Sequence, residues 1–195
     1  QHELQARAKM TASGIENHKR LAHMEAPTEE QIKLLPMPKV IAAMRDFMTN
    51  EAVIAAALLY LVDFTTISQR RKGCVDEKIF EHLIKAMVTH HTGKVVSERA
   101  CNLVGRLCAG TDFAALQRCD LAARAGCIAQ LVKAMQLHHT LSGLQGHGCC
   151  ALATLTFGHG SDAAERRQLA LEVCPQPCTA RSTRTDFVPG TSLLL

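Results

Sequence analysis

Cysteine and histidine are the residues of this sequence best suited to chemistry, and the chain contains nine and ten of them. They are densest at His147-Gly148-Cys149-Cys150, and Cys174 and Cys178 form a second close pair. A structural zinc ion needs four such ligands, usually supplied as two short-spaced pairs. No second pair with zinc-type spacing stands at a workable distance, so the pattern favours packing and predicts no metal or other cofactor. A Cys/His metal- or redox-sensing helical protein stays open as an alternative.

Two further patterns are similar to parts of nucleotide-binding or catalytic sites. The run 158–162 is similar to a phosphate-binding loop, but it lacks the preceding strand and the lysine of such a loop. We expect Ser161 and Asp162 to cap a helix over 163–173 instead. The pairs His90-His91 and His138-His139 follow apolar segments, where an imidazolium is favourable at a helix C-terminus. Catalysis by Cys and His also needs a pocket and an orienting group. Neither is visible, so the sequence predicts a non-enzymatic protein.

The bulk composition predicts an all-α protein and excludes several partners. The chain has 195 residues, of which 47% are hydrophobic and only 4% aromatic, and Ala and Leu dominate, which favours helices over strands. The net charge of +4 is dispersed, and its one dense cluster, Arg70-Arg71-Lys72, is expected to be a solvated turn. Nucleic acid is therefore not an expected partner. The longest apolar run, 52–62, is shorter than the about 20 residues that span a membrane, so no membrane partner is expected either.

The positions of the cysteines predict the compartment. Cys101, Cys108, Cys149 and Cys150 stand inside apolar helical stretches, where they are expected to pack as small hydrophobic residues. Secreted disulfide scaffolds place cysteines in loops instead. The sequence therefore predicts a cytoplasmic protein, with the nucleus as the alternative.

The helices are expected to form a repeat, because one apolar phrase that ends in Ala-Met occurs three times. The methionines that close the phrases are separated by 43 and 48 residues. Thirteen residues after each methionine stands a small residue, and twenty residues after it stands a large apolar one. Such in-phase recurrence is the signature of stacked helical units. The three phrases are Val40–Met44, Leu83–Met87 and Leu131–Met135; the small residues are Ala57, Ala100 and Gly148; the large ones are Phe64, Leu107 and Leu155.

Each unit is expected to contain a short first helix, a second helix with the Ala-Met phrase and a third helix. In the third helix over 97–108, apolar residues recur at i, i+3, i+4, i+7 and i+8, which predicts one buried stripe. Gly126 is expected to end the first helix of one unit, and Gly73 the corresponding segment of the preceding unit. Because that segment is short, its first helix must be short or absent, with 76–80 lengthening the following helix.

This pattern resembles the armadillo repeat. The best match runs from Ala125 to Met135, where a Gly-Ile-type turn leads into a Leu-Val helix, and 148–156 supplies the third-helix phrase. HEAT-type units are the nearest alternative. The resemblance implies an α-solenoid of about three armadillo-like repeats over 37–174. Residues 1–36 are then a helical lead-in, with a degenerate repeat as one reading, and 175–195 are a flexible tail.

The resemblance also implies that the third helices line a concave face that binds a protein or peptide partner. The asparagine ladder and tryptophan row of nuclear-import receptors are missing at the matching positions, so that peptide site is not expected. A mixed polar patch anchored by the Asp63 carboxylate and the Arg106 guanidinium is predicted in its place. The alternative is a solvated face with internal ion pairs such as Glu98 with Arg106. The candidate partner-binding residues are Leu59, Asp63, Glu98, Asn102, Arg106, Cys150 and Thr154.

The sequence thus predicts a non-enzymatic interaction scaffold. A regulatory segment of a larger multidomain enzyme, such as a leucine-rich-repeat kinase, is the alternative of a different class, because similar divergent repeats occur in such proteins.

Overall fold

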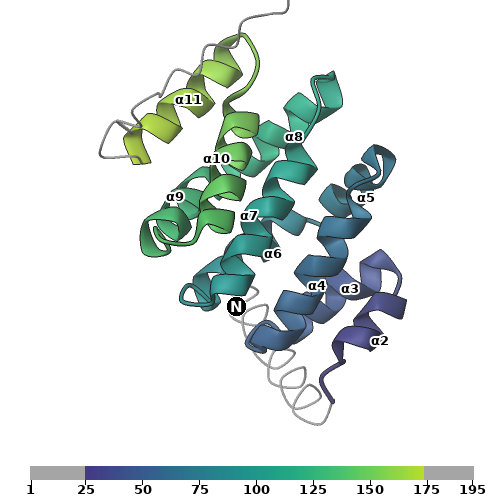
Figure 1. The fold of residues 1–195 in the computed structure, drawn as a ribbon. Coiled ribbons are helices and arrows are strands. Elements are labelled where there is room, and N and C mark those ends of the chain that lie inside the picture. Colours follow the sequence, from purple (N-terminus) through teal and green to yellow (C-terminus); the bar gives the residue numbers. More distant parts are fainter. Residues whose placement is uncertain (1–24, 174–195) are drawn as a thin grey trace, which may run out of the picture.

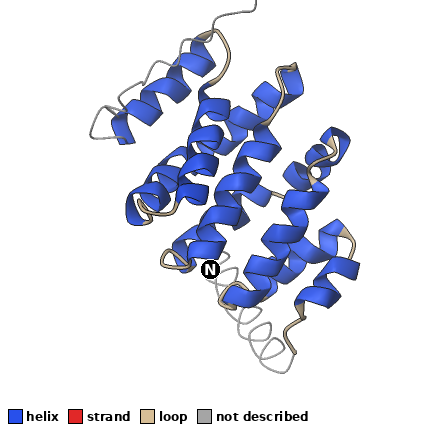
Figure 2. Cartoon of the chain, viewed as in Figure 1, coloured by secondary structure: helices blue, strands red, loops and turns tan. Residues whose placement is uncertain are grey.

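The protein is all-helical throughout the part that the computed structural model describes, residues 25–173. This part contains ten α-helices, one 3-10 turn and no strand (Figure 2). The helices are α2 (Glu29–Leu34), α3 (Met37–Asp46), α4 (Glu51–Phe64), α5 (Arg71–Asp76), α6 (Ile79–Thr89), α7 (Lys94–Cys108), α8 (Phe113–Arg124), α9 (Cys127–Leu137), α10 (Ser142–Thr156) and α11 (Ser161–Val173), with the 3-10 turn η1 over Ser68–Arg70.

The helices stack in rows (Figure 1). In one row α7 lies between α4 and α10 and makes its most extensive contacts with them. A second row packs behind, in which α6 contacts both α3 and α9. Helices α8 and α11 contact each other, and with α5 they lie along the edge of the rows at which α4, α7 and α10 end; α2 packs on α4. The three Ala-Met phrases fall on α3, α6 and α9, as the periodicity predicts.

The core lies between the two main rows and is almost entirely aliphatic. The predicted stripe on α7 is confirmed, because Ala100, Leu103, Val104, Leu107 and Cys108 are all fully buried. The small residue thirteen positions after each methionine also has a physical reason. A methyl group added to Gly148 of α10 would come 2.5 Å from the Met135 sulfur of α9, so a larger residue there requires the Met135 side chain to move. The spacing found in the sequence therefore reflects the packing of second helices on third helices.

Buried histidines connect neighbouring units. Nε2 of His90, after α6, donates to the Met48 carbonyl oxygen at 2.8 Å, and Nε2 of His138, after α9, donates to the His91 carbonyl oxygen at 2.9 Å. Each histidine is the first of its pair, and each bonds the second residue after the end of the second helix of the preceding unit. The first histidine of each pair is thus structural, and the carbonyl acceptors assign its ring proton to Nε2.

Arginines cap the third helices in a recurring way. Arg118 of α8 donates to the Leu107 and Ala109 carbonyl oxygens at the end of α7, and Arg166 of α11 donates to those of Leu155 and Phe157 at the end of α10. The last carbonyls of a helix lack partners within it, so a cation placed there is stabilising. Arg166 is only 3% exposed and also pairs with Asp120 of α8.

The structure corrects the expectation for the basic cluster 70–72. Arg71 is half-buried and donates to the Thr65 and Ala109 carbonyl oxygens at 3.1 and 2.8 Å, so it joins the ends of α4 and α7 and is no solvated turn residue. Its backbone lies in the short α5, which confirms that the corresponding helix is short.

The predicted break at Gly73 is wrong. This glycine lies inside α5, and the chain breaks at Lys78, whose φ of +56° is left-handed. Lys78 stands nine residues before Met87, as Gly126, with a φ of +94°, stands nine before Met135. The turn therefore keeps its place in the repeat without a glycine, and α6 starts at Ile79 without being lengthened by 76–78. A second boundary also differs from the prediction: α11 begins at Ser161, two residues earlier than predicted.

Half of the predicted packing of cysteines is also wrong. Cys101 and Cys108 are fully buried, whereas Cys149 and Cys150 of α10 are exposed. Cys101 is fully buried in α7, which lies between α4 and α10, whereas α10 is the last third helix of its row among residues 25–173. The same position in the repeat is therefore covered in α7 and open in α10.

Some predictions fall on other parts of the chain. The 1–24 portion of the lead-in, the tail 175–195 and the Cys174–Cys178 pair lie outside the described residues. Within 25–173, no helix is both long and apolar enough to cross a bilayer.

Candidate functional site

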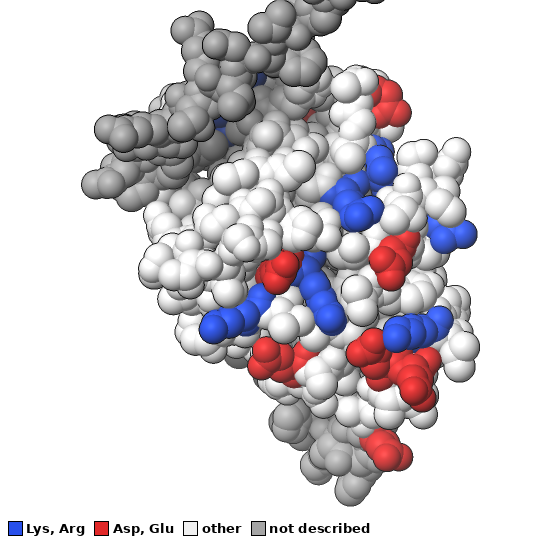
Figure 3. Space-filling model, in the orientation of Figure 1, with Lys and Arg blue, Asp and Glu red and all other residues white. Residues whose placement is uncertain are grey.

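The seven candidate residues lie on α4, α7 and α10, and we call the solvent-facing side of these helices the third-helix face. Figure 3 views this face and shows positive and negative side chains interspersed over α4 and α7. The surface over α10 is uncharged, because 142–156 contains no Asp, Glu, Lys or Arg. On each helix the candidates include an i, i+4 pair, a spacing that places both side chains on one side of a helix.

The α4 pair, Leu59 and Asp63, lines one cavity of about 490 Å³. Tyr60 and Phe64 complete its apolar floor, with ring centroids 5.8 Å apart and ring planes 17° from parallel. Arg70 reaches over the Phe64 ring at 4.9 Å from its centroid, a favourable cation–π arrangement. Lys33 of α2 forms another part of the wall. The cavity thus joins an aromatic floor to one acid and two bases.

The candidate residues of α7 do not form the ion pair between Glu98 and Arg106 that the sequence offered as an alternative. Arg106 Nε donates to Asn102 Oδ1 at 3.1 Å, and Glu98 forms no ion pair with Arg106. The Glu98 carboxylate instead lies against Gly143, the second residue of α10, where a methyl group would collide with it. Helix α10 has no side-chain N-cap of its own, and a carboxylate is stabilising near a helix N-terminus. Glu98 is therefore a structural residue as much as a surface one.

A comparable contact recurs one unit earlier. A methyl group on Gly93, which precedes α7, would come 2.6 Å from Glu51 Oε1 of α4, and α7 also lacks a side-chain N-cap. Helices α4 and α7 thus each place a carboxylate near the start of the next third helix.

The α10 pair, Cys150 and Thr154, offers little polarity to solvent. Thr154 Oγ1 donates to the Cys150 carbonyl oxygen at 2.8 Å, so the hydroxyl is turned back onto its own helix. Cys150 is exposed and carries a free thiol. Within residues 25–173, no hydrogen bond or ion pair joins the pair on one third helix to the pair on the next.

Positive charge gathers where α4 and α7 end. Burial, and then the charges of Arg118 and Arg106, lower the pKa of Arg71 from its ordinary value. These three guanidiniums therefore lie near one another. Asp63, in the last turn of α4, forms no ion pair within the described chain. The face thus presents an unpaired carboxylate and an unpaired guanidinium on adjacent helices.

Sequence reasoning missed the aromatic floor and both bases of the cavity. The i, i+4 spacing of Tyr60 and Phe64 is a signal that could have found the stacked rings. Lys33 and Arg70 carry no such signal, because they reach the cavity from α2 and η1. Residues 25–173 contain no group of three or more His, Cys, Asp or Glu that could hold a metal ion.

The comparisons with known proteins add no relative. The chain matches no protein-family model, no curated protein sequence and no solved structure.

Proposed function

We propose that this chain is an armadillo-like α-solenoid that acts as a non-enzymatic protein-interaction scaffold through its third-helix face. The order of helices supports this reading, because α8, α9 and α10 form a three-helix unit whose second and third helices recur as α6–α7 and α3–α4. Armadillo units contain three helices and HEAT units two, so the presence of α8 and α11 as first helices favours the armadillo type.

The unpaired charges of Asp63, in the cavity with the aromatic floor, and of Arg106, on the adjacent helix, are the observation that carries the proposed function. Asp63 and Arg106 have no ion-pair partner within residues 25–173, although Lys33 and Arg70 line the same cavity as Asp63. A face that served only as a solvated surface needs no stacked rings beneath such a carboxylate. Tyr, Trp, Phe and Arg are enriched where proteins bind one another.

The chemistry of the face indicates the kind of partner. An apolar side chain of an extended peptide fits the floor formed by Leu59, Tyr60 and Phe64. A basic residue of that peptide would pair with Asp63, and an acidic residue would pair with Arg106. Charge complementarity of this kind sets orientation and rejects wrong partners.

The test is selection of peptides from a random display library on the purified chain. Peptides that carry an apolar residue between opposite charges should be enriched, and D63A/R106A should lower their affinity about tenfold or more. The matched control is E81A/K85A, which removes one exposed acid and one exposed base from α6, in the other row of helices. Equal affinity of the selected peptides for the parent and D63A/R106A would refute the proposed site.

A further inference from the structure

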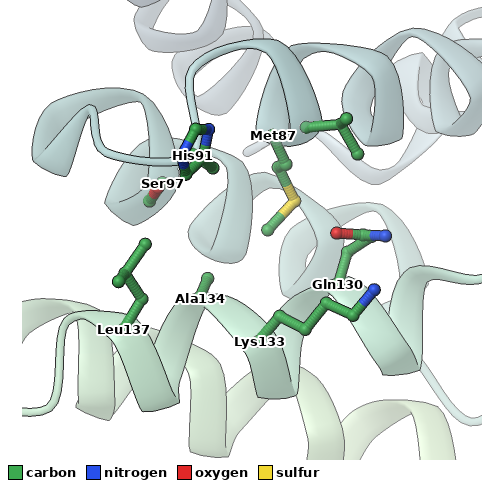
Figure 4. Close-up of a pocket in the computed structure, with 8 residues that line it drawn as sticks. Met87, His91, Ser97, Gln130, Lys133, Ala134 and Leu137 are labelled. Carbon is green, nitrogen blue, oxygen red and sulfur yellow. The ribbon is translucent and has the colours of Figure 1, made fainter.

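A second cavity lies in the other row of helices, between α6 and α9 (Figure 4). Its volume is about 360 Å³, within the range of about 300–1,000 Å³ that is usual for small-molecule sites. Met87 and Ala134 face each other across its middle. Lys133 and Gln130 lie at one end, and His91 and Ser97 lie at the other, near Leu137. The cavity is thus apolar in the middle and polar at both ends.

Comparison with the corresponding residues of the preceding unit explains why this cavity exists. The wall residues His91 and Ser97 stand four and ten residues after Met87. Four and ten residues after Met44 stand Met48 and Ile54, which are 6% and 0% exposed and belong to the hydrophobic core. Two core side chains of one unit are therefore replaced in the next unit by two polar ones. Repeat packing alone does not require such an exchange.

Ser97 adds a polar group to the wall of the cavity. The residue is 1% exposed, and within residues 25–173 no buried side-chain oxygen or nitrogen lacks a hydrogen-bond partner. A serine hydroxyl can donate one hydrogen bond and accept two, so Ser97 can still bind a polar group that enters the cavity.

The opposite end of the cavity favours a negative charge. Lys133 is exposed and forms no ion pair with the described residues, and no Asp or Glu lines the cavity. The Gln130 side chain can donate a second hydrogen bond beside it. From Gln130 to Leu137 is about 10 Å along α9. An extended aliphatic chain of about eight carbon–carbon bonds has that length.

We propose that this cavity binds a medium-chain carboxylate that carries a hydrogen-bonding group at its far end. The carboxylate pairs with the Lys133 ammonium, the methylene chain covers Met87 and Ala134, and the far group meets the Ser97 hydroxyl and the His91 imidazole. The site lies away from the third-helix face and is independent of the function proposed for that face.

The first experiment is calorimetric titration of the full chain with 8-hydroxyoctanoate, octanoate and octane-1,8-diol. The hydroxy acid should bind tightest, because it alone combines a carboxylate for Lys133 with a hydroxyl for Ser97. Lys133→Met should weaken both acids about tenfold and leave the diol unchanged. Ser97→Ala should weaken the hydroxy acid about fivefold and leave octanoate unchanged. Lys85→Met, at the same place in the preceding unit, is the matched control and should leave every affinity unchanged.

The second experiment fills the cavity with the side chains of the preceding unit. The variant H91M/S97I should lose binding of all three probes while its circular dichroism and unfolding transition show that it is folded. If it fails to fold, the pattern expected of Lys133→Met and Ser97→Ala decides alone. Absence of binding by all probes to the parent chain overturns the proposal. So does equal affinity for 8-hydroxyoctanoate and the diol, or binding that survives H91M/S97I.

Discussion

At the scale of single residues, burial separates the cysteines into two classes. Cys74, Cys101 and Cys127 are closed off among apolar side chains, and burial raises the pKa of these thiols to about 11, about 12 and about 12. A thiol held in its protonated form is neither a nucleophile nor a metal ligand. Cys149 and Cys150 are exposed and remain open to solution. The density of cysteines in the sequence therefore does not by itself indicate chemistry.

The buried thiols predict a loss of stability at alkaline pH. The unfolded Cys101 thiol ionises near pH 9, whereas the folded thiol keeps its proton up to about pH 12. The unfolded state therefore binds fewer protons in this window, and the free energy of unfolding falls as pH rises above 9. Cys101 should contribute a slope that starts at about 0.7 kcal/mol per pH unit at pH 9, where the unfolded thiol is half ionised, and approaches about 1.4 above pH 10. Urea unfolding of the parent and of Cys101→Ala between pH 9 and pH 10.5 measures it as the difference between two slopes.

The matched comparison for this slope is Cys127→Ala, because burial raises the pKa of that thiol similarly. Each single variant should show a shallower decline than the parent, and the double variant should show the sum. Parallel declines in all four proteins would show that ionisation of these thiols is not linked to unfolding.

At the scale of elements, a turn keeps its place when its residue type changes. Lys78 and Gly126 occupy the same position before α6 and α9, and both have positive φ. A left-handed backbone costs a residue with a side chain about 1–2 kcal/mol, and glycine avoids this cost but loses more entropy on folding. Lys78→Gly should therefore raise the free energy of unfolding by about 0.5 kcal/mol. The reciprocal Gly126→Lys should lower it by about 1 kcal/mol or more. Chemical denaturation measures both, and a destabilising Lys78→Gly would contradict the prediction.

The sequence predicts the second and third helices well, because their apolar stripes recur at helical spacing. It fails at Lys78 because no composition signal marks a lysine with left-handed φ. It fails at Arg71 because the carbonyls that Arg71 binds come from two different helix ends. Neither failure concerns an apolar residue.

In the candidate site, too, the features that follow from the repeat could be predicted, and those that depend on contacts between distant elements could not. The i, i+4 pairs on α4, α7 and α10 follow from the repeat, whereas Lys33 reaches its cavity only because α2 packs on α4. The exposure of Cys149 and Cys150 depends on which third helix ends the described row. The cavity between α6 and α9 could have been found from the sequence, by comparing His91 and Ser97 with Met48 and Ile54.

At the scale of the whole molecule, neighbouring units are joined by contacts that recur from one unit to the next. A carboxylate of one third helix lies at the start of the next, and a histidine after one second helix binds a carbonyl of the preceding unit. Arg166 adds an ion pair with Asp120 of the preceding first helix. In the α-solenoid that we propose, such contacts transmit stability only between adjacent units. A substitution that removes one of these contacts should therefore destabilise only the adjacent units.

His138→Ala tests this expectation. The substitution removes a buried hydrogen bond and leaves the His91 carbonyl without its partner, which should cost about 1–2 kcal/mol. Hydrogen exchange should then become about tenfold faster in α9, α10 and α11, with α3 and α4 unchanged, because local opening follows local stability. His139→Ala, at the exposed second histidine of the pair, is the control and should leave exchange unchanged. Uniform acceleration from α3 to α11 would show one cooperative unit instead, and the histidine contact would then stabilise the molecule as a whole.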